Sequence, residues 1–402
     1  MFKIKGKVNT AICYANVVEA EAVEQIRRMC DHDFTAGSKI RIMPDVHAGK
    51  GCTIGTTMTI TDKVVPNVVG VDIGCGMYTV ELGKVEIDFK KVDEVAHFIP
   101  SGRNVWERPV GRFDLTELRS YENLKQTKRL ERSLGTLGGG NHFIEIESAS
   151  DGNKYLVVHS GSRNLGKQVA EYYQNLAVEL NTGKADFFEK REELIRSYRE
   201  QGRHREIKAA IKALEKKHKR KKTAIPPDLC YLYGSYMDDY LHDVQLCQLF
   251  AKRSREKMAE IILERSGMTA LSAFHTIHNY INVDEMILRK GAISAHKDEL
   301  LLIPINMRDG SILARGRGNP DWNYSAPHGA GRIMSRTMAR KTFDLEEYKK
   351  TMSDVYTTSV NRATLDEAPM AYKSLEDIID DIRESVDIIE VLKPIYNFKA
   401  PD

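Results

Sequence analysis

The sequence VGVDIGCGM at residues 69–77 sets Asp72 and Cys75 three residues apart in a glycine-rich turn. A carboxylate and a thiolate so close together are ligands for a borderline-soft divalent cation such as Mn²⁺ or Zn²⁺. Such an ion needs further ligands, and the histidines that could supply them lie far downstream. The fold must therefore bring distant loops to this turn, and that pattern favours a catalytic metal over a structural zinc knot.

Four isolated histidines lie in loops beside small or polar residues rather than on a helical face: His142, His159, His278 and His328. A metal-bound thiolate can bridge two ions. Cys75 in that role would join Asp72 and His142 around one ion. His159 and His278 would complete the other, giving a two-metal centre suited to phosphate chemistry. The alternative is a single closed Zn²⁺ site, against which the surplus and dispersion of the ligands count.

His328 lies in the segment SAPHGAGR at residues 325–332, where it could act as a ligand, a base or a nucleophile. An imidazole beside a metal-bound phosphate can attack phosphorus. Three cations follow the same loops and fit phosphate oxygens, or else pair at the surface: Arg163, Lys290 and Arg332. The chain contains neither a Walker A nor a Rossmann fingerprint, so metals and loop backbone would have to hold any nucleotide.

The composition describes an ordinary globular protein of 402 residues, with 42% hydrophobic and 29% charged residues and a net charge of +3. Six scattered cysteines form no CxxC pair, which argues against a zinc ribbon and a disulfide framework. The N-terminus lacks the apolar stretch of a signal peptide, and no apolar run reaches the ~20 residues of a membrane helix. We therefore expect a cytoplasmic protein without a membrane partner.

Hydrophobic spacing predicts an α+β fold in one interleaved domain. Its segments are short strands and tight turns at 1–100, more helical and polar sequence at 88–134, helices at 166–266, loops and strands at 270–335, and two or more amphipathic helices from about 344 to the end. Strands leading into glycine-rich loops that carry Asp, Cys or His recur through it. We expect a mixed β-sheet core with surrounding helices and a central cleft.

A basic segment at 184–224 interrupts the helical region. It holds many cations against few acids: Arg199, Arg203, Arg205, Lys208, Lys212, Lys216, Lys217, Lys219, Arg220, Lys221 and Lys222. Gly183 and Pro226-Pro227 bracket it, which indicates a protruding helical hairpin. The basic run 216–222 favours contact with a phosphate backbone, and the alternative is a solvated pair of surface helices.

Eight motifs, in order along the chain, resemble the RtcB RNA ligases. They are MPDVHAGKG (43–51), VGVDIGCGM (69–77), GTLGGGNHFIEI (135–146), VVHSGSR (157–163), HNY (278–280), RKGA (289–292), HGAGR (328–332) and PMAYK (369–373). The resemblance implies a single RtcB-like domain over 1–402 with a hairpin inserted at 184–224. It also implies an enzyme that uses GTP and two Mn²⁺ ions to join an RNA 3′-phosphate or 2′,3′-cyclic phosphate to a 5′-hydroxyl, in RNA repair or tRNA splicing.

The resemblance also implies roles for individual residues. The Mn²⁺ ligands are Asp72, Cys75, His142, His159 and His278, with Cys75 shared, and His328 attacks GTP and carries GMP. Asn141, Glu145 and Lys399 match residues around the guanylate. The residues needed for guanylylation, or for holding the RNA 3′-phosphate, match Asp45, Arg163, Lys290 and Arg332. An activating protein partner is compatible with this family.

The chain departs from the family pattern at two places. Where the family reads Pro-Gly-Ser-Met-Gly, residues 304–311 read PINMRDGS, which bears on nucleotide affinity or preference. The chain ends in KAPD rather than Lys-Gly, which bears on Lys399. Two alternatives follow: an enzyme that only opens cyclic phosphates or caps 3′-phosphates with GMP, and a non-catalytic RNA-binding subunit.

Overall fold

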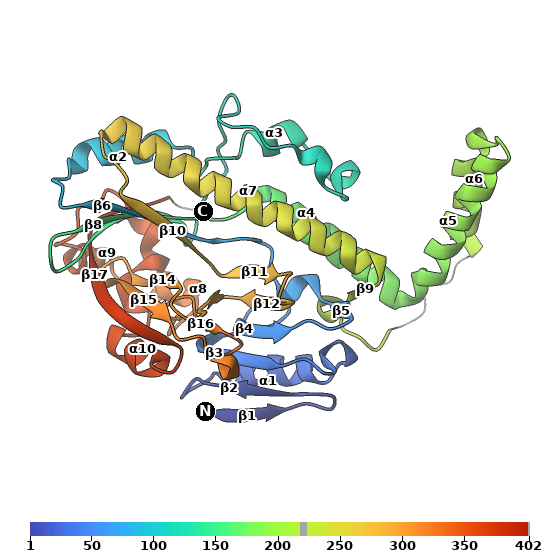
Figure 1. Ribbon diagram of the computed structural model, residues 1–402, viewed down its shortest axis with the longest axis horizontal. Coiled ribbons are helices and arrows are strands. Elements are labelled where there is room, and N and C mark those ends of the chain that lie inside the picture. Colours follow the sequence, from blue (N-terminus) through green and yellow to red (C-terminus); the bar gives the residue numbers. More distant parts are fainter. Residues whose placement is uncertain (218–222, 401–402) are drawn as a thin grey trace.

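A six-stranded sheet forms one part of the centre of the computed structural model, which describes residues 1–217 and 223–400 (Figure 1). Its strands, in spatial order, are β1 (Phe2–Lys5), β2 (Thr10–Cys13), β3 (Ile40–His47), β4 (Ile54–Thr59), β12 (Ile287–Lys290) and β11 (Asn279–Asn282). The β2–β3 pair is parallel and the others are antiparallel. Pairing of β4 with β12 joins segments more than two hundred residues apart.

A seven-stranded antiparallel sheet forms the other part. Its order is β10 (Ser272–Ile277), β6 (Gly76–Gly83), β8 (Lys154–Ser160), β7 (Phe143–Ser148), β17 (Val386–Lys399), β15 (Gly310–Gly316) and β14 (Leu300–Asn306). Alternate apolar residues of β7 and β8, such as Ile144 and Val158, are fully buried in one core cluster. Two short pairs complete the strands: β13 (Ala292–Ser294) with β16 (Ser325–Pro327), and β5 (Lys63–Val64) with β9 (Leu232–Tyr233).

Two long helices, α4 (Arg163–Glu179) and α7 (Ser235–Ser266), lie side by side across the sheets (Figure 1). Buried α7 residues such as Met258 and Ile262 pack on the apolar face of β7 and β8. The other helices are α1 (Ala20–Cys30), α2 (Phe89–Phe98), α3 (Thr127–Glu131), α8 (Arg336–Thr342), α9 (Leu345–Thr351) and α10 (Leu375–Ile382). No described helix is both long and apolar enough to cross a membrane.

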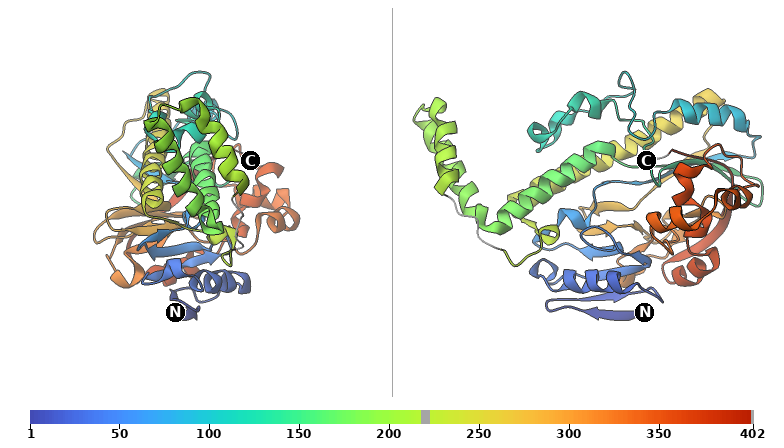
Figure 2. Two further views of the ribbon diagram at one scale, coloured as in Figure 1. Left: turned by 90° about the vertical axis from the view of Figure 1, so that its right-hand side faces the viewer. Right: turned by 180° about the vertical axis from the view of Figure 1, so that it is seen from behind.

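Helices α5 (Ala185–Glu200) and α6 (Ile207–Lys217) project away from the sheets beyond the end of α4 (Figures 1 and 2). Gly183 and Gly202 have φ of 86° and 70°, and these left-handed conformations end one helix before the next begins. The side chains of the basic run 216–222 lie outside the described part of the chain. That 184–224 is an inserted hairpin of a single 1–402 domain remains a prediction.

The mixed sheets and surrounding helices confirm the predicted fold class, but two segments differ from the prediction. The expected helices are present as α9 and α10, but residues 386–399 form β17, which hydrogen-bonds to β7 on one side and β15 on the other. Pro394 concealed this strand, since proline is uncommon in central strands. It is accommodated at a register shift between Pro394 and Tyr396. The stretch 88–134 is also less helical than expected, because between α2 and α3 it holds short 3₁₀ turns and loops.

Candidate active site

Five of the sequence-predicted ligands meet where β6, β7, β8 and β11 begin or end. The Sγ atom of Cys75 lies 3.4 Å from Nε2 of His142 and 3.4 Å from Nε2 of His159. On one side, His142 Nε2 is 3.0 Å from a carboxylate oxygen of Asp72. On the other, His159 Nε2 is 3.1 Å from Nε2 of His278. These atoms form two groups that share Cys75, each compact enough to hold one metal ion.

Backbone carbonyls fix which nitrogen of each imidazole faces the thiol. Nδ1–H of His142 donates to the Leu137 carbonyl at 2.9 Å, and Nδ1–H of His159 donates to the Asn141 carbonyl at 3.0 Å. Because a carbonyl only accepts, the Nε2 atom of each neutral ring carries a lone pair. Such an outer hydrogen bond is how proteins orient metal-binding histidines. The two lone pairs, the thiol and the Asp72 carboxylate therefore converge as donors toward cations.

Burial shifts the pKa values of the ligand groups in this cluster. It depresses the pKa of His159 and His278 well below the ordinary value, so both rings are neutral, which is the form that binds metals. Burial, with the Asp72 charge adding to it, raises the pKa of the Cys75 thiol well above its ordinary value. A bound divalent cation reverses the effect on the thiol and deprotonates it. The donor set therefore fits divalent metal.

Two glycines let the ligand loops approach one another. A Cβ atom at Gly161 would lie 2.1 Å from the Asp72 carboxylate. A Cβ atom at Gly138, whose φ is 91°, would lie 2.0 Å from the guanidinium of Arg163 and 2.6 Å from Nδ1 of His142. Any larger residue at either position would displace a ligand. The glycine-rich motifs of the sequence are thus explained by packing around the cluster.

His328 lies next to the ligand cluster, at the end of β16. Its ring stacks on that of His278 with 4.7 Å between centroids. The fully buried Asp45 accepts hydrogen bonds from His328 Nδ1 at 2.6 Å and from the His328 amide at 3.1 Å. The carboxylate thereby keeps the proton on Nδ1 and leaves the Nε2 lone pair free for chemistry.

A cleft of about 270 Å³ opens beside His328 and contains much of the predicted nucleotide site. Its lining includes Asn141, Glu145, His159, His278, His328, Arg332 and Lys399. Burial raises the pKa of Glu145 to about 7, and Glu145 accepts a hydrogen bond from the Asn397 amide at 2.5 Å. The structure therefore brings the metal cluster, His328 and these polar groups to one place.

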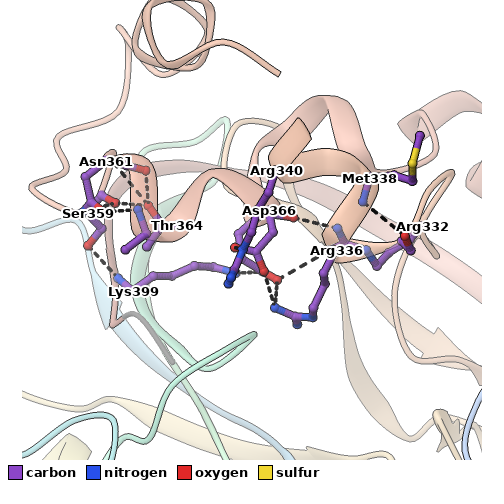
Figure 3. A network of polar contacts seen from close by, with 12 residues as sticks. Arg332, Arg336, Met338, Arg340, Ser359, Asn361, Thr364, Asp366 and Lys399 are labelled. Carbon is purple, nitrogen blue, oxygen red and sulfur yellow. Dashed lines mark hydrogen bonds and ion pairs between the residues drawn. The ribbon is translucent and has the colours of Figure 1, made fainter. Parts of the chain in front are cut away.

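Buried acidic residues hold the cations at the far side of this cleft. Glu367 is 2% exposed and bonds to Nζ of Lys399, to the Tyr372 hydroxyl at 2.9 Å and to Arg336 at 2.7 Å. Figure 3 shows the arginines around the neighbouring Asp366, whose carboxylate also binds Arg336 at 2.8 Å. Sequence reasoning missed Glu367 and Arg336, although the first lies two residues before the PMAYK motif and the second four residues after HGAGR.

Two predicted cations lie outside the nucleotide cleft. Nζ of Lys290 is buried and donates to the carbonyls of Lys50 at 2.5 Å and Asn67 at 3.0 Å. Arg163 has a φ of 58°, an uncommon conformation for a non-glycine residue, and lines a second cleft of about 730 Å³ beyond Asp72. That cleft also contains Arg103, Arg129 and Lys167. Of the three predicted cations, Arg332 lines the nucleotide cleft, Arg163 lines the second cleft and Lys290 lines neither.

The segment that departs from the family pattern forms the turn between β14 and β15, and its residues Ile305, Asn306 and Met307 line the nucleotide cleft. The Asn306 side chain accepts hydrogen bonds from the amides of Arg308 at 3.0 Å and Asp309 at 2.9 Å. The Arg308 guanidinium pairs with the Asp309 carboxylate at 2.8 and 2.7 Å. The polar side chains of this turn therefore bind one another.

The family model described as "tRNA-splicing ligase RtcB" matches residues 25–113 and 110–400. The chain is 30% identical to the RNA-splicing ligase RtcB of Escherichia coli K12 over 95% of each protein. It is 26% identical to the tRNA-splicing ligase RtcB of Aeropyrum pernix, over 83% of this chain and 82% of that protein. RNA-splicing ligase RtcB2 of another E. coli strain is also 26% identical, over 89% of this chain and 86% of the relative.

Proposed function

The chain belongs to the RtcB family of RNA-splicing ligases, and we propose that it joins RNA 3′-phosphate or 2′,3′-cyclic phosphate ends to 5′-hydroxyl ends with GTP and two Mn²⁺ ions. The observation that carries the proposal is the free Nε2 of His328 beside two metal-binding groups that share one thiol. Neither a closed Zn²⁺ knot nor a simple RNA-binding surface needs such a nitrogen.

We assign the cations to the two groups found in the structure. Asp72, Cys75 and His142 would hold one, and Cys75, His159 and His278 the other. When bound, the cations neutralise charge on phosphate oxygens. The protein's own part is to turn Nε2 of His142 and of His159 toward the cations through the Nδ1 contacts with carbonyls, and to hold the cluster in a buried setting.

His328 would be the nucleophile toward GTP. Nε2 forms a bond to the α-phosphorus, the bond from that phosphorus to the β-bridging oxygen breaks, and pyrophosphate leaves with the electron pair. The Nδ1 proton stays on the ring, where the Asp45 carboxylate stabilises the positive charge that develops. The RNA 3′-phosphate then takes GMP from His328. Finally the 5′-hydroxyl attacks the RNA 3′-phosphorus, loses its proton and expels GMP.

The positions of the remaining charges support separate binding of nucleotide and RNA. Glu145, Lys399 and Arg332 line the His328 cleft and fit the nucleotide. Arg163, with three other cations in the second cleft, fits RNA phosphates on the opposite side of Asp72. We extend the RNA contact to the basic segment 184–224, for which the salt dependence of RNA affinity is the direct measurement.

Guanylylation of His328 tests the proposal. The protein is incubated with Mn²⁺ and α-labelled GTP, denatured and assayed for covalent label that is acid-labile and stable to alkali, as expected of a phosphorus–nitrogen bond. We expect labelling of the wild type and of His275→Ala, whose histidine lies outside the cleft, but not of His328→Ala. Label that survives His328→Ala would remove His328 as the nucleophile. Ligation of a broken stem-loop with 3′-phosphate and 5′-hydroxyl ends then separates joining from GMP capping.

A further inference from the structure

Helix α7 carries a fully buried arginine directly behind the metal ligands. Arg255 has no exposed surface, and one terminal nitrogen of its guanidinium donates to two backbone carbonyls. The acceptors are Gly74 at 2.7 Å and Ser160 at 2.8 Å. Among the described residues, no other atom accepts a hydrogen bond from this guanidinium, whose other two nitrogens have no partner, and none of the ion pairs found there includes Arg255. Every hydrogen bond that the structure gives Arg255 therefore goes to these two carbonyls.

The two carbonyls belong to residues adjacent to metal ligands. Gly74 precedes Cys75, whose thiol is shared by both groups, and Ser160 follows His159. Gly76 and Ser160 are the last paired residues at this end of strands β6 and β8. Arg255 bonds to the backbone just at this end, where the ladder itself supplies no further hydrogen bonds between the strands. It thus joins the Cys75 turn to the His159 strand.

The charge of Arg255 also favours a role at the metal centre. Burying a guanidinium without a paired carboxylate costs several kcal/mol, so a chain that needed only a hydrogen-bonded link would gain from a neutral side chain here. Burial lowers the pKa of Arg255, and its electrostatic interactions with Cys75 and Asp72 act against that shift. A fixed positive charge behind them offsets the negative charge that Asp72 and a metal-bound Cys75 thiolate bring to the cluster.

We propose that Arg255 is a positioning residue for the metal centre, which sets the separation of the Cys75 and His159 ligand atoms by clamping their backbones. The inference rests on the proposed function only in taking the two groups as metal sites. Arg255 itself would contact neither metal nor RNA, because its side chain is fully buried and lines neither of the two clefts. Its loss should accordingly change how metal binds even when no nucleotide or RNA is present.

Cobalt binding provides a test that does not depend on ligase activity. Co²⁺ is titrated into metal-free protein, and the thiolate-to-cobalt charge-transfer absorption reports coordination by Cys75. Arg255→Met removes the charge and both hydrogen bonds at similar length, and we expect Co²⁺ affinity about 10–100-fold lower with a shifted absorption band. Arg255→Lys keeps the charge, but its ammonium sits on a shorter and more flexible stem that does not fix the nitrogen between the two carbonyls, so it should restore only part of the affinity. Arg253→Met, an exposed arginine on the same helix, is the matched control and should bind as the wild type does.

The outcomes separate the two proposals. If wild-type protein gives no thiolate-to-cobalt band, the metal site itself is wrong. If the wild type gives the band and Arg255→Met gives the same band with the same affinity, the positioning role is overturned. Thermal unfolding of the metal-free variants shows whether each is folded. Should Arg255→Met not fold, the decision passes to Arg255→Lys, for which wild-type affinity and spectrum would overturn the inference.

Discussion

The metal side and the nucleotide side of the active site satisfy their polar groups in opposite ways. Around Cys75, ligand atoms converge on one another: Nε2 of His159 lies 3.1 Å from Nε2 of His278, and Nε2 of His142 lies 3.0 Å from the Asp72 carboxylate. Around Glu367, by contrast, each charge meets its opposite, as in the pairing with Arg336 at 2.7 Å. The first region needs cations to be complete, whereas the second is complete within the protein.

This difference predicts in which region a substitution should abolish function and in which region it should only weaken function. Both metal-binding groups depend on the one thiol that they share, so the cluster should either bind metal or lose its function. A preformed set of ion pairs holds its geometry before any ligand arrives, and Arg336 still has Asp366 as a partner when Glu367 is lost. Substitutions on the metal side should therefore have the larger effects.

Cys75→Ala should have the largest effect, because both groups lose the one ligand that they share. We expect no stoichiometric Mn²⁺ in equilibrium dialysis and no labelling of His328 by GTP. Cys247→Ala removes another fully buried thiol, on α7, and should keep both properties. Normal metal content in Cys75→Ala would rule out the shared thiolate and, with it, the contrast between the two regions.

The metal side was the more predictable region from sequence. Its ligands lie in short glycine-rich loops, and the carboxylate and thiol of VGVDIGCGM already define the chemistry. The contact of Asp45 with His328 was not predictable from the residues alone, because 283 positions separate them and only the β-sheet pairings bring them together. The resemblance to a family, rather than spacing, pointed to Asp45.

Arg255 and Glu367 show what the sequence conceals. Arg255 lies within a 32-residue helix among many other charged residues, and nothing in that pattern distinguishes a buried arginine from an exposed one. Glu367 is the last residue of a 3₁₀ turn, and its role depends on ion pairs with three cations from other segments, Arg332, Arg336 and Lys399. Strand β17, which carries Lys399 to the cleft, was mistaken for a helix. Residues that act by supporting others leave no local motif, so tertiary contacts alone identify them.

Glu367→Gln tests the nucleotide side, with a smaller expected effect. The amide keeps the shape but not the charge that holds Lys399 and Arg336. Hydrogen bonds to charged groups contribute about 1.5–3 kcal/mol, so we expect the KM for GTP in guanylylation to rise about 10–100-fold with a lesser change in kcat. Mn²⁺ binding should be unchanged, which is the property that distinguishes this region from the metal side.

Asp366→Asn is the matched control for that variant. Asp366 binds Arg336 and Arg340 but makes no contact with Lys399 among the described ion pairs. A role for Glu367 at the nucleotide predicts a clearly larger KM effect than Asp366→Asn produces. Equal effects of the two substitutions would mean that the acidic pair only stabilises the fold here. A loss of Mn²⁺ binding in Glu367→Gln would mean that the metal side depends on the nucleotide side.

The smallest expected effect is on the pH dependence of stability, and it comes from Glu147, a buried acid on the strand that also carries Glu145. Glu147 has no exposed surface and accepts a hydrogen bond from the Ser311 hydroxyl at 2.6 Å. Burial, with Glu145 adding to it, raises the Glu147 pKa well above the ordinary 4.5, while burial raises that of Glu145 to about 7. The unfolded chain releases both protons near pH 4.5 and the folded protein retains them. The folded state thus binds more protons above pH 4.5, and the free energy of unfolding falls as pH rises.

Glu147→Gln removes one of these retained protons, since the amide is neutral in both states and still accepts from Ser311. In urea unfolding of metal-free protein, we expect the variant to be more stable than wild type at pH 8, by a margin that shrinks toward pH 5. The depressed pKa values of His159 and His278 act in the opposite direction but are common to both proteins, so they cancel in the difference. Glu376→Gln, at an exposed helical position, should show no pH-dependent margin. A margin for Glu147→Gln that does not change with pH would mean that the folded protein holds this carboxyl ionised. The nucleotide side would then contain a buried charge without an opposite charge beside it, and the contrast with the metal side would be lost.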